Sequence, residues 1–476
     1  MSKGDTDPIY EKKLPFEDEI GKLSDSEAPK ILTKELPGPE SKKILDQLYK
    51  LETPTIVGAN VLPVVWARAR GATVEDLDGN KYIDMMGGVA VNNVGHSHPE
   101  VVRAMHEQAG QVAHTADFPS PARIRLLEKL TQIAPGDMKG QSRVAFAMSG
   151  SDAVETALKI AKYHTKRTEI VAFQGAYHGV TAGALALTTN RVYKRGLPPS
   201  IPGVHFAPYP YCYRCPFGKK FPDCDLECAR YTGDLMTKSG MGLADRPAAV
   251  IMEPVQGEGG YVVPPKEAVE WIAKVAREND IVFIDDEVQA GFCRTGRWFA
   301  TEHYGVTPDL LTAGKGLGGD FPVAAVIGHK KIMDNLPTVW NPVTFGGNAV
   351  GAAVSLKNIE LMERYDLCAR SEVLGGYFMK LLKELESTSK IVGDVRGLGL
   401  MIGIELVKDK TTKAPMDMDK MMWLIHKMRD NGVLVLIAGR NENVVRLMPP
   451  LVITKEHIDK TFTIFSSILK ELERSI

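Results

Sequence analysis

Short apolar runs alternate with helix-like segments through the middle of the chain. The segment at 267–279, EAVEWIAKVAREN, places Val269, Ile272 and Ala276 on one helical face. Strands that alternate with helices predict a mostly parallel β-sheet with helices on both faces, an α/β fold. The apolar runs that we expect to be buried strands are 144–148, 170–173, 248–252, 281–284 and 310–312.

The two ends of the chain follow other patterns. The first fifty residues are polar and rich in proline, which indicates an arm, with a helix expected from about Ser41. Residues 64–86 read as β-hairpins. Strands at 391–399, 400–406, 433–438 and 443–449 are interleaved with helices. We therefore expect an arm at 1–50, the first part of a small domain at 51–100, a large domain at 101–344 and the rest of the small domain at 345–476.

Charge and composition exclude several kinds of partner. The 476 residues include 58 Lys and Arg against 59 Asp and Glu, so the basic excess of a nucleic-acid-binding protein is absent. No run approaches the roughly 18 apolar residues of a membrane span. The polar start has no apolar segment typical of a secretory signal. We expect a cytoplasmic protein that binds neither nucleic acid nor membrane.

Residues that could carry chemistry follow the expected strands. Ligands of open parallel sheets bind outside the carboxyl ends of the strands, so these positions converge on one site. They are Ser149-Gly150-Ser151, Gln174-Gly175-Ala176-Tyr177-His178, Glu253-Pro254, Asp285-Asp286-Glu287 and Gly314-Lys315-Gly316.

Each of these positions has a functional and a purely structural interpretation. The Gly150-Ser151 turn opens a helix and suits a phosphate, although an ordinary capped helix has the same pattern. Asp286, after a buried strand, is either a structural ion pair or the partner of a cationic ligand atom. Lys315, between glycines, is either a solvated loop lysine or an amine nucleophile that forms imines.

The combined motifs resemble one enzyme family. SGSDAVE, YHG, EPVQGEGG, DDEVQAGFCRTG, GKGLGG and TFGGN, in this order, resemble the class III aminotransferases, which are fold-type-I pyridoxal 5'-phosphate (PLP) enzymes. The resemblance runs from about Trp66 to Leu451. It implies a seven-stranded, mostly parallel sheet in the large domain and a smaller α/β domain built from both chain ends. It also implies a homodimer or dimer of dimers, with active sites at the subunit interface.

The resemblance assigns a role to individual residues. Lys315 would form the Schiff base with PLP and move the proton at the substrate's Cα, while Asp286 would pair with the pyridine nitrogen. Arg446 would bind the substrate carboxylate, and Glu258 would pair with that arginine. The other implied cofactor contacts are Gly150, Ser151 and the neighbouring subunit's Thr344 at the phosphate, Tyr177 and Val288 on the ring faces, Gln289 at the ring hydroxyl, and His178 and Glu253 around the pocket.

Two positions depart from the family pattern. Val180 stands where members that act on ω-amino acids with 2-oxoglutarate often have arginine, although Arg191 or Arg195 could substitute. Asp320 stands where relatives usually have a neutral residue. Its carboxylate is either simply solvated or tunes the site.

The sequence thus predicts an aminotransferase that moves an amino group between an amino acid, ornithine-like or ω-amino, and a 2-oxo acid. The alternative is a PLP-dependent amino-acid racemase or epimerase, a branch of the same family. Val180 favours this alternative, because racemisation needs no dicarboxylate co-substrate. A PLP-binding protein without turnover is the third interpretation.

Four of the six cysteines lie in one loop. Cys212, Cys215, Cys224 and Cys228 have the spacing C-x2-C-x8-C-x3-C, which can close a tetrahedral zinc site. Reduced thiols or oxidation-dependent bridges are the alternatives.

Overall fold

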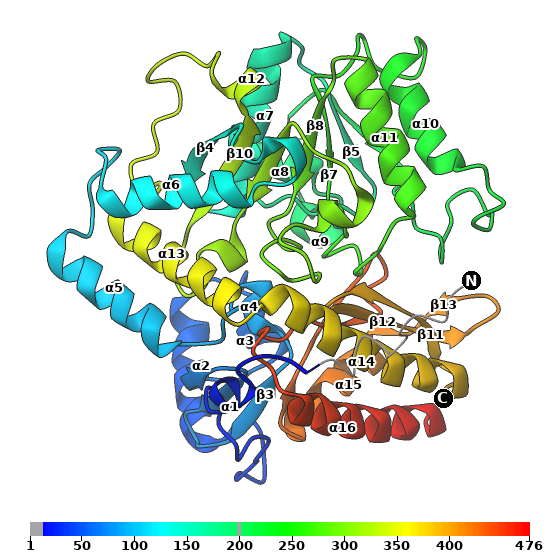
Figure 1. The fold of residues 1–476 in the computed structure, drawn as a ribbon. Helices are drawn as coiled ribbons and strands as arrows, with labels where there is room; N and C mark the ends of the chain where they lie inside the picture. Colours follow the sequence, from blue (N-terminus) through cyan, green and yellow to red (C-terminus); the bar gives the residue numbers. More distant parts are fainter. Residues whose placement is uncertain (1–12, 198–200) are drawn as a thin grey trace, which may run out of the picture. The chain divides into compact units, whose positions relative to one another are not determined.

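The computed structural model describes residues 13–197 and 201–476, which form two compact units (Figure 1). Unit 1 contains the described residues up to Pro99 together with Tyr365–Ile476, and unit 2 is Glu100–Arg364. The expected boundary at 345 falls inside unit 2, because helix α13 (Ala349–Arg364) packs along helix α6 (Pro121–Ile133) of the same unit.

Unit 2 is built on a seven-stranded sheet with the strand order β4-β10-β9-β8-β7-β5-β6. Strand β10 pairs antiparallel with β4 and β9, and the other pairs are parallel. The five expected apolar runs are strands, whereas β6 and β10 were not expected. Strand β6 is a half-buried edge strand with a weak sequence signal, whereas β10 follows a buried apolar run at 323–327 that sequence reasoning overlooked. The strands are β4 (Ser142–Ala147), β5 (Ile170–Phe173), β6 (Val204–Ala207), β7 (Ala249–Met252), β8 (Val282–Asp286), β9 (Leu310–Ala313) and β10 (Ala324–His329).

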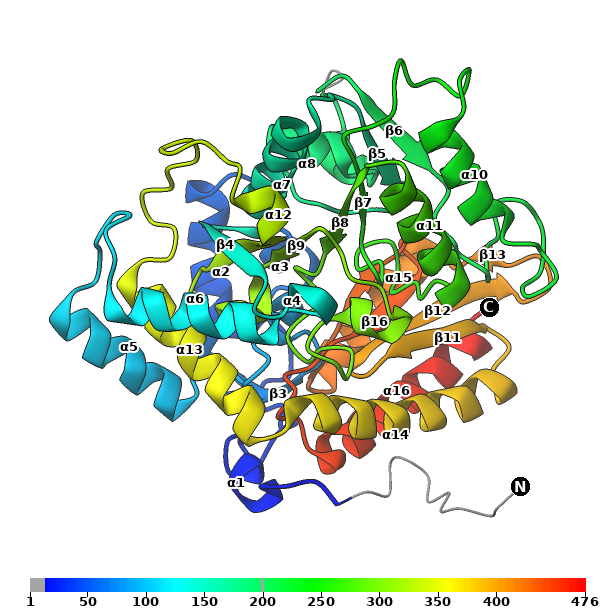
Figure 2. The same ribbon diagram turned by 45° about the horizontal axis from the view of Figure 1, so that its top comes forward.

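Helices cover both faces of this sheet. Ile170 and Ala172 of β5 pack in the core beneath α7 and α8, whereas Val171 and Phe173 pack beneath α10 and α11, because successive strand residues point to opposite faces. Figure 2 shows these two pairs of helices on opposite sides of the strands. The helices of unit 2 include α7 (Gly150–Thr165), α8 (Ala182–Leu187), α9 (Arg191–Lys194), α10 (Glu227–Thr237), α11 (Lys266–Glu278) and α12 (Lys330–Met333); α5 (Pro99–Gln111) begins at the unit boundary.

Unit 1 combines both ends of the chain in one sheet. Strand β14 (Val433–Leu434) pairs parallel with β3 (Lys81–Asp84), which continues the expected hairpins β1 (Trp66–Arg70) and β2 (Thr73–Asp76). A second sheet has the order β11-β12-β16-β15, with β13 beside β12. Its strands are β11 (Val392–Leu398), β12 (Met401–Asp409), β13 (Ala414–Pro415), β15 (Leu436–Ala438) and β16 (Val444–Leu447).

The helices of unit 1 include the one expected from about Ser41. This helix, α2 (Pro39–Leu51), buries Leu45 but leaves Ile44 and Leu51 exposed. Across the described residues, no helix is both long and apolar enough to cross a membrane. The other helices of this unit are α1 (Glu17–Gly21), α3 (Gly58–Val61), α4 (Gly87–Ala90), α14 (Leu367–Thr388), α15 (Met418–Asp430) and α16 (Lys455–Arg474).

Candidate active site

A cavity of about 170 Å³ lies in unit 2, where the carboxyl ends of β4, β5, β7, β8 and β9 meet. Ten of the twelve residues to which the resemblance assigns a role line this cavity, and seven of these ten also belong to the strand-end set. The lining residues are Ser149, Gly150, Ser151, Tyr177, His178, Gly179, Glu253, Glu258, Asp286, Val288, Gln289 and Lys315.

The first turn of α7 forms one wall of the cavity. Ser149 caps the helix, since its Oγ accepts the N–H of Asp152 at 3.2 Å. A Cβ at Gly150 would lie 2.7 Å from Cγ1 of Val288, so only glycine fits there without a shift. The N–H groups at this helix end and the positive end of the helix dipole favour a phosphate.

Three donors hold the carboxylate of Asp286 at the end of β8. Its Oδ2 lies 2.6 Å from His178 Nδ1, and its Oδ1 accepts hydrogen bonds from the Thr312 hydroxyl at 2.9 Å and the Val288 N–H at 3.2 Å. Burial lowers the pKa of His178, but the hydrogen bond and negative charge of Asp286 outweigh burial and raise it. Asp286 is therefore a fixed, buried acceptor suited to a cationic ring nitrogen.

Glu253 joins two loops at the edge of the cavity. Its Oε1 accepts the N–H of Tyr177 at 3.0 Å, and its Oε2 accepts the N–H of Gly257 at 2.9 Å. The side chain is buried, and burial raises the pKa of Glu253 to about 7. This carboxyl group therefore fixes the backbone that carries Tyr177.

Lys315 enters the cavity from a strained turn. It follows β9 through Gly314, and its φ of 44° lies in the left-handed region that non-glycine residues rarely adopt. Such strain is concentrated at functional sites. The strained position is consistent with a reactive amine held at one point of the cavity.

The buried oxygen of Gln289 supports a ligand with a hydroxyl group. Gln289 lines the cavity, and its Oε1 has no hydrogen-bond partner among the described residues. A buried acceptor without a partner is costly unless a ligand supplies the donor. PLP fits this donor and acceptor set: α7 for its phosphate, Asp286 for its ring nitrogen, Gln289 for its hydroxyl and Lys315 for its aldehyde.

Two expected site residues do not line this cavity. Thr344 is exposed in a turn of unit 2. Arg446 lies in unit 1, on β16, where it is buried and stands opposite Gly403 of β12. The expected roles of these two residues stay predictions.

The two departures from the family pattern are also exposed. Val180 has 53% of its surface exposed, and its N–H donates to Ser151 Oγ at 3.2 Å. Asp320 is exposed in the turn after Lys315.

The cysteine loop follows β6, and the last of its four cysteines, Cys228, lies in the first turn of α10. All four thiols are free of disulfides, with Cys212 exposed and Cys224 buried. Partial desolvation of the thiol is the main cause that raises the pKa of both Cys212 and Cys228 to about 11, and the charges of the neighbouring thiols add to it. Within the described residues, no group of three or more His, Cys, Asp or Glu is arranged to hold a metal ion. The expected zinc site at Cys212, Cys215, Cys224 and Cys228 thus finds no support in this geometry.

Sequence reasoning assigned no role to Gly179, the last residue of the YHG motif, or to Thr312. Gly179 has a φ of 121°, and a Cβ there would collide with the Ser151 side chain. Its position directly after Tyr177 and His178 in the chain could have indicated that it lies at the site. Thr312, the polar residue of strand LLTA, points its hydroxyl at Asp286. That contact depends on the pairing of β8 with β9.

Comparison with known proteins gives the following matches. The family described as aminotransferase class-III matches residues 56–469. A leucine/methionine racemase from Thermococcus litoralis is 38% identical over 439 residues, 91% of this chain and 95% of the racemase. A 4-aminobutyrate aminotransferase from Mycobacterium leprae is 38% identical over 452 residues, 94% of this chain and 99% of that protein. The crystal structure of a PLP-bound amine transaminase from an uncultivated Pseudomonas species has a TM-score of 0.82 and 30% identity, covering 89% of this chain and 98% of that one.

Proposed function

This chain belongs to the class-III aminotransferase family, with PLP as its cofactor, and we propose that it moves an amino group between an amino acid and a 2-oxo acid. The observation that carries this proposal is the convergence of Lys315, Asp286 and the Gly150-Ser151 turn on one cavity. These three elements match the amine, acid and phosphate contacts that PLP chemistry requires.

Each residue of the cavity has a role in the proposed reaction. When bound, PLP supplies a conjugated ring that stabilises negative charge at the substrate's Cα. Lys315 would accept the Cα proton through Nζ and return it during transamination. Asp286, held by His178, would keep a proton on the ring nitrogen. Gly150 and Ser151 would hold the phosphate.

Other residues would orient the cofactor ring and the substrate. Tyr177 and Val288 would pack against the two faces of the cofactor ring, and Gln289 would accept a hydrogen bond from the ring hydroxyl. Arg446 would bind the substrate's carboxylate through its planar fork, and Glu258 would pair with Arg446 when that carboxylate is absent.

Racemisation of a neutral amino acid is the second candidate function. The relative from Thermococcus litoralis, a leucine/methionine racemase, is 38% identical to this chain. Val180 is an apolar, exposed residue next to Ser151. It offers no positive charge to the distal carboxylate of a dicarboxylic substrate such as 2-oxoglutarate. In this reaction Lys315 would remove the Cα proton, and a second group would return a proton from the opposite face.

The functional assembly that we propose is a homodimer. Unit 2 exposes large apolar side chains near the Thr344 turn, with Val339 at 92% and Phe345 at 53% exposure. Contiguous apolar patches mark surfaces that bind another protein, and in the proposed homodimer these two side chains would belong to such a patch. A second copy would cover them and bring Thr344 of the partner subunit to the phosphate. The expected cytoplasmic location stays a prediction.

One experiment separates the two candidate reactions. The PLP-loaded chain is incubated in heavy water with single L-amino acids and no 2-oxo acid, and deuterium at Cα and optical rotation are measured. Transamination predicts one conversion per site to the amine form of the cofactor, reversed by an added 2-oxo acid. Loss of optical rotation over many turnovers would refute it and establish racemisation.

The role of Lys315 has its own test. Lys315→Ala is expected to lose both the absorbance band of lysine-bound cofactor and borohydride trapping of the cofactor on the chain. Lys274→Ala, at an exposed lysine of α11, is the matched control and should keep both. A Lys315→Ala variant that retains the trapped cofactor would contradict the assignment.

A further inference from the structure

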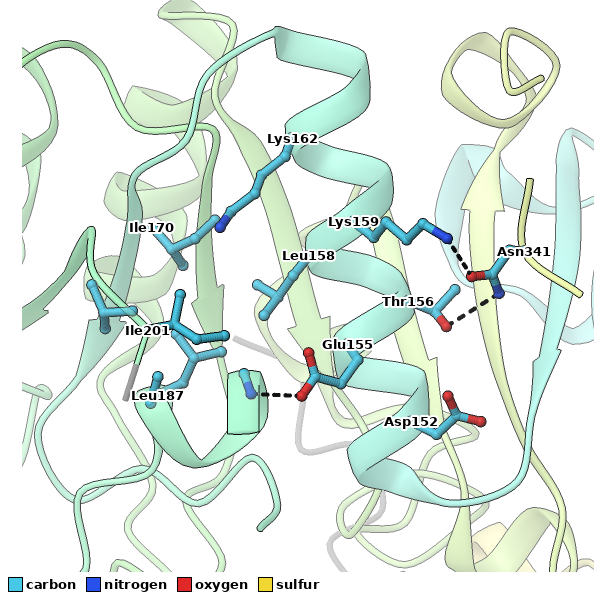
Figure 3. Close-up of a pocket in the computed structure, with 13 residues that line it drawn as sticks. Asp152, Glu155, Thr156, Leu158, Lys159, Lys162, Ile170, Leu187, Ile201 and Asn341 are labelled. Carbon is cyan, nitrogen blue, oxygen red and sulfur yellow. Dashed lines mark hydrogen bonds between the residues drawn. The ribbon is translucent and has the colours of Figure 1, made fainter. Parts of the chain in front are cut away.

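The side chain of Glu155 holds the first turn of α8. Its Oε1 accepts the N–H of Gly183 at 2.7 Å and the N–H of Ala184 at 3.1 Å. Figure 3 shows this carboxylate pointing from α7 toward α8, with a dashed line to the backbone nitrogen. N–H groups in the first turn of a helix have no partner within that helix. Glu155 therefore supplies the N-terminal cap of α8 from a different helix.

The residues at the start of α8 do not cap the helix themselves and leave room for the carboxylate of Glu155. Thr181 occupies the N-cap position but accepts no hydrogen bond from the helix. Its hydroxyl instead donates to Glu155 Oε1 at 2.8 Å. A Cβ at Gly183 would collide with the Glu155 carboxylate, so glycine leaves the space that this side chain fills.

Helix α8 carries the loop that contains Tyr177 and His178. The His178 N–H donates to Thr188 Oγ1 at 2.9 Å, and the Thr188 hydroxyl donates to the carbonyl of Gly179 at 2.9 Å. The N–H of Thr189 donates to the carbonyl of Ala176 at 2.9 Å. The loop and the end of α8 are thus one hydrogen-bonded body.

Two side chains of α7 attach this body to the proposed phosphate turn. Ser151 accepts the N–H of Val180, and Glu155 holds the start of α8. These residues are four positions apart and share one face of the helix. Glu155 itself lines the neighbouring cavity of about 370 Å³ in Figure 3, not the candidate active site.

We propose that Glu155 is a positioning residue for the cofactor: through α8 it holds Tyr177 and His178 in register with the Gly150-Ser151 turn. The proposal rests on the assignment of the cavity as the PLP site. The phosphate contact and the ring contact then belong to one rigid arrangement. Loosening α8 weakens both contacts, although Glu155 touches neither group.

Two conservative variants separate the contact from the charge. Glu155→Gln keeps an oxygen at the same reach, whereas Glu155→Asp keeps the charge but withdraws the oxygen by one methylene group. Because all three donors bind Oε1, Glu155→Gln should leave the PLP dissociation constant unchanged within experimental error. Glu155→Asp should raise it about tenfold, which corresponds to the loss of one or two buried hydrogen bonds.

The measurements are PLP titration of the full-length chain, visible circular dichroism of the bound cofactor, and thermal unfolding of the cofactor-free chain. A positioning role predicts that Glu155→Asp also reduces the visible dichroism. Lys162→Ala is the control, since Lys162 lines the same cavity and has no side-chain partner among the described residues. This control should behave as wild type.

Several outcomes would overturn the proposal. A folded Glu155→Asp chain with wild-type affinity and dichroism, but a lower unfolding midpoint, would show a purely structural role. Weakening in Glu155→Gln but not in Glu155→Asp would trace the effect to the charge rather than to the hydrogen bonds. If Glu155→Asp fails to fold, Thr181→Val removes a single donor and must weaken PLP binding about threefold for the proposal to stand. A wild-type chain that does not bind PLP would instead refute the proposed function.

Discussion

Replacing Glu253 with glutamine should reverse the order of stability between wild type and variant as the pH rises. The carboxyl group is buried and accepts the N–H groups of Tyr177 and Gly257 on its two oxygens. Burial raises its pKa from 4.5 to about 7. Because the folded chain binds this proton more tightly than the unfolded chain, the stabilisation is complete below about pH 4.5 and is lost as the pH rises through about 7.

The size of the effect follows from the pKa difference. The shift from 4.5 to about 7 corresponds to about 3 kcal/mol of unfolding free energy lost across this pH range. Glutamine is neutral at every pH, so Glu253→Gln avoids this loss. Its NH₂ group faces one of the two backbone N–H groups, which costs about 1–2 kcal/mol at all pH values. The variant should be less stable than wild type at pH 4.5 and more stable, by about 1–2 kcal/mol, at pH 8.

The assay is urea unfolding of the cofactor-free chain between pH 4.5 and 8, at one chain concentration, followed by circular dichroism. The exposed Glu270 of α11 is the matched control site, and Glu270→Gln should differ from wild type by a nearly constant amount. His178 and Asp286 are present in every protein compared, and the charge of Glu253 contributes to the raised pKa of His178, so the difference reports Glu253 together with this coupling. A stability difference that does not change with pH, or a deficit of the variant that grows as the pH rises, would refute the burial argument.

Three further predictions address binding. Ser151→Ala should raise the PLP dissociation constant about tenfold, since it removes a hydroxyl from the phosphate turn; titration that gives the wild-type value contradicts this role. Arg446→Lys should raise the KM for the amino acid about tenfold, with kcat changed less than about threefold, because lysine lacks the bidentate fork; steady-state kinetics with an unchanged KM excludes Arg446 from substrate binding. The zinc interpretation of the cysteine loop predicts one zinc ion per chain, which is lost in Cys224→Ser and kept in Cys368→Ser. A zinc content near zero in the wild-type chain would contradict this interpretation and would identify the four cysteines as ordinary thiols.

Much of the site was predictable because its residues follow buried strands. Asp286 ends strand β8, Glu253 follows β7, and Lys315 follows β9 after one glycine. Parallel strands end at one edge of a sheet, so local patterns of burial already imply that these residues meet. The family resemblance then added a chemical role to each position.

Other contacts could not be predicted from local patterns. Glu155 reads in sequence as an ordinary exposed residue of an amphipathic helix, yet it caps α8, which begins more than twenty residues later. Helix α13 also reads as the start of the small domain, but its packing along α6 places it in unit 2. These outcomes depend on which surfaces meet after the sheet has formed.

The sequence by itself determined the α/β class, five of the seven strands of the large sheet and the chemical identity of the residues at their ends. Periodicity and turn residues act over a few positions, and they suffice for these features. Only the tertiary structure decided how those residues are held: Asp286 by Thr312 and His178, and the Tyr177 loop by Glu253. Hydrogen bonds between distant segments depend on the assembled fold, and they convert a set of suitable residues into one cavity.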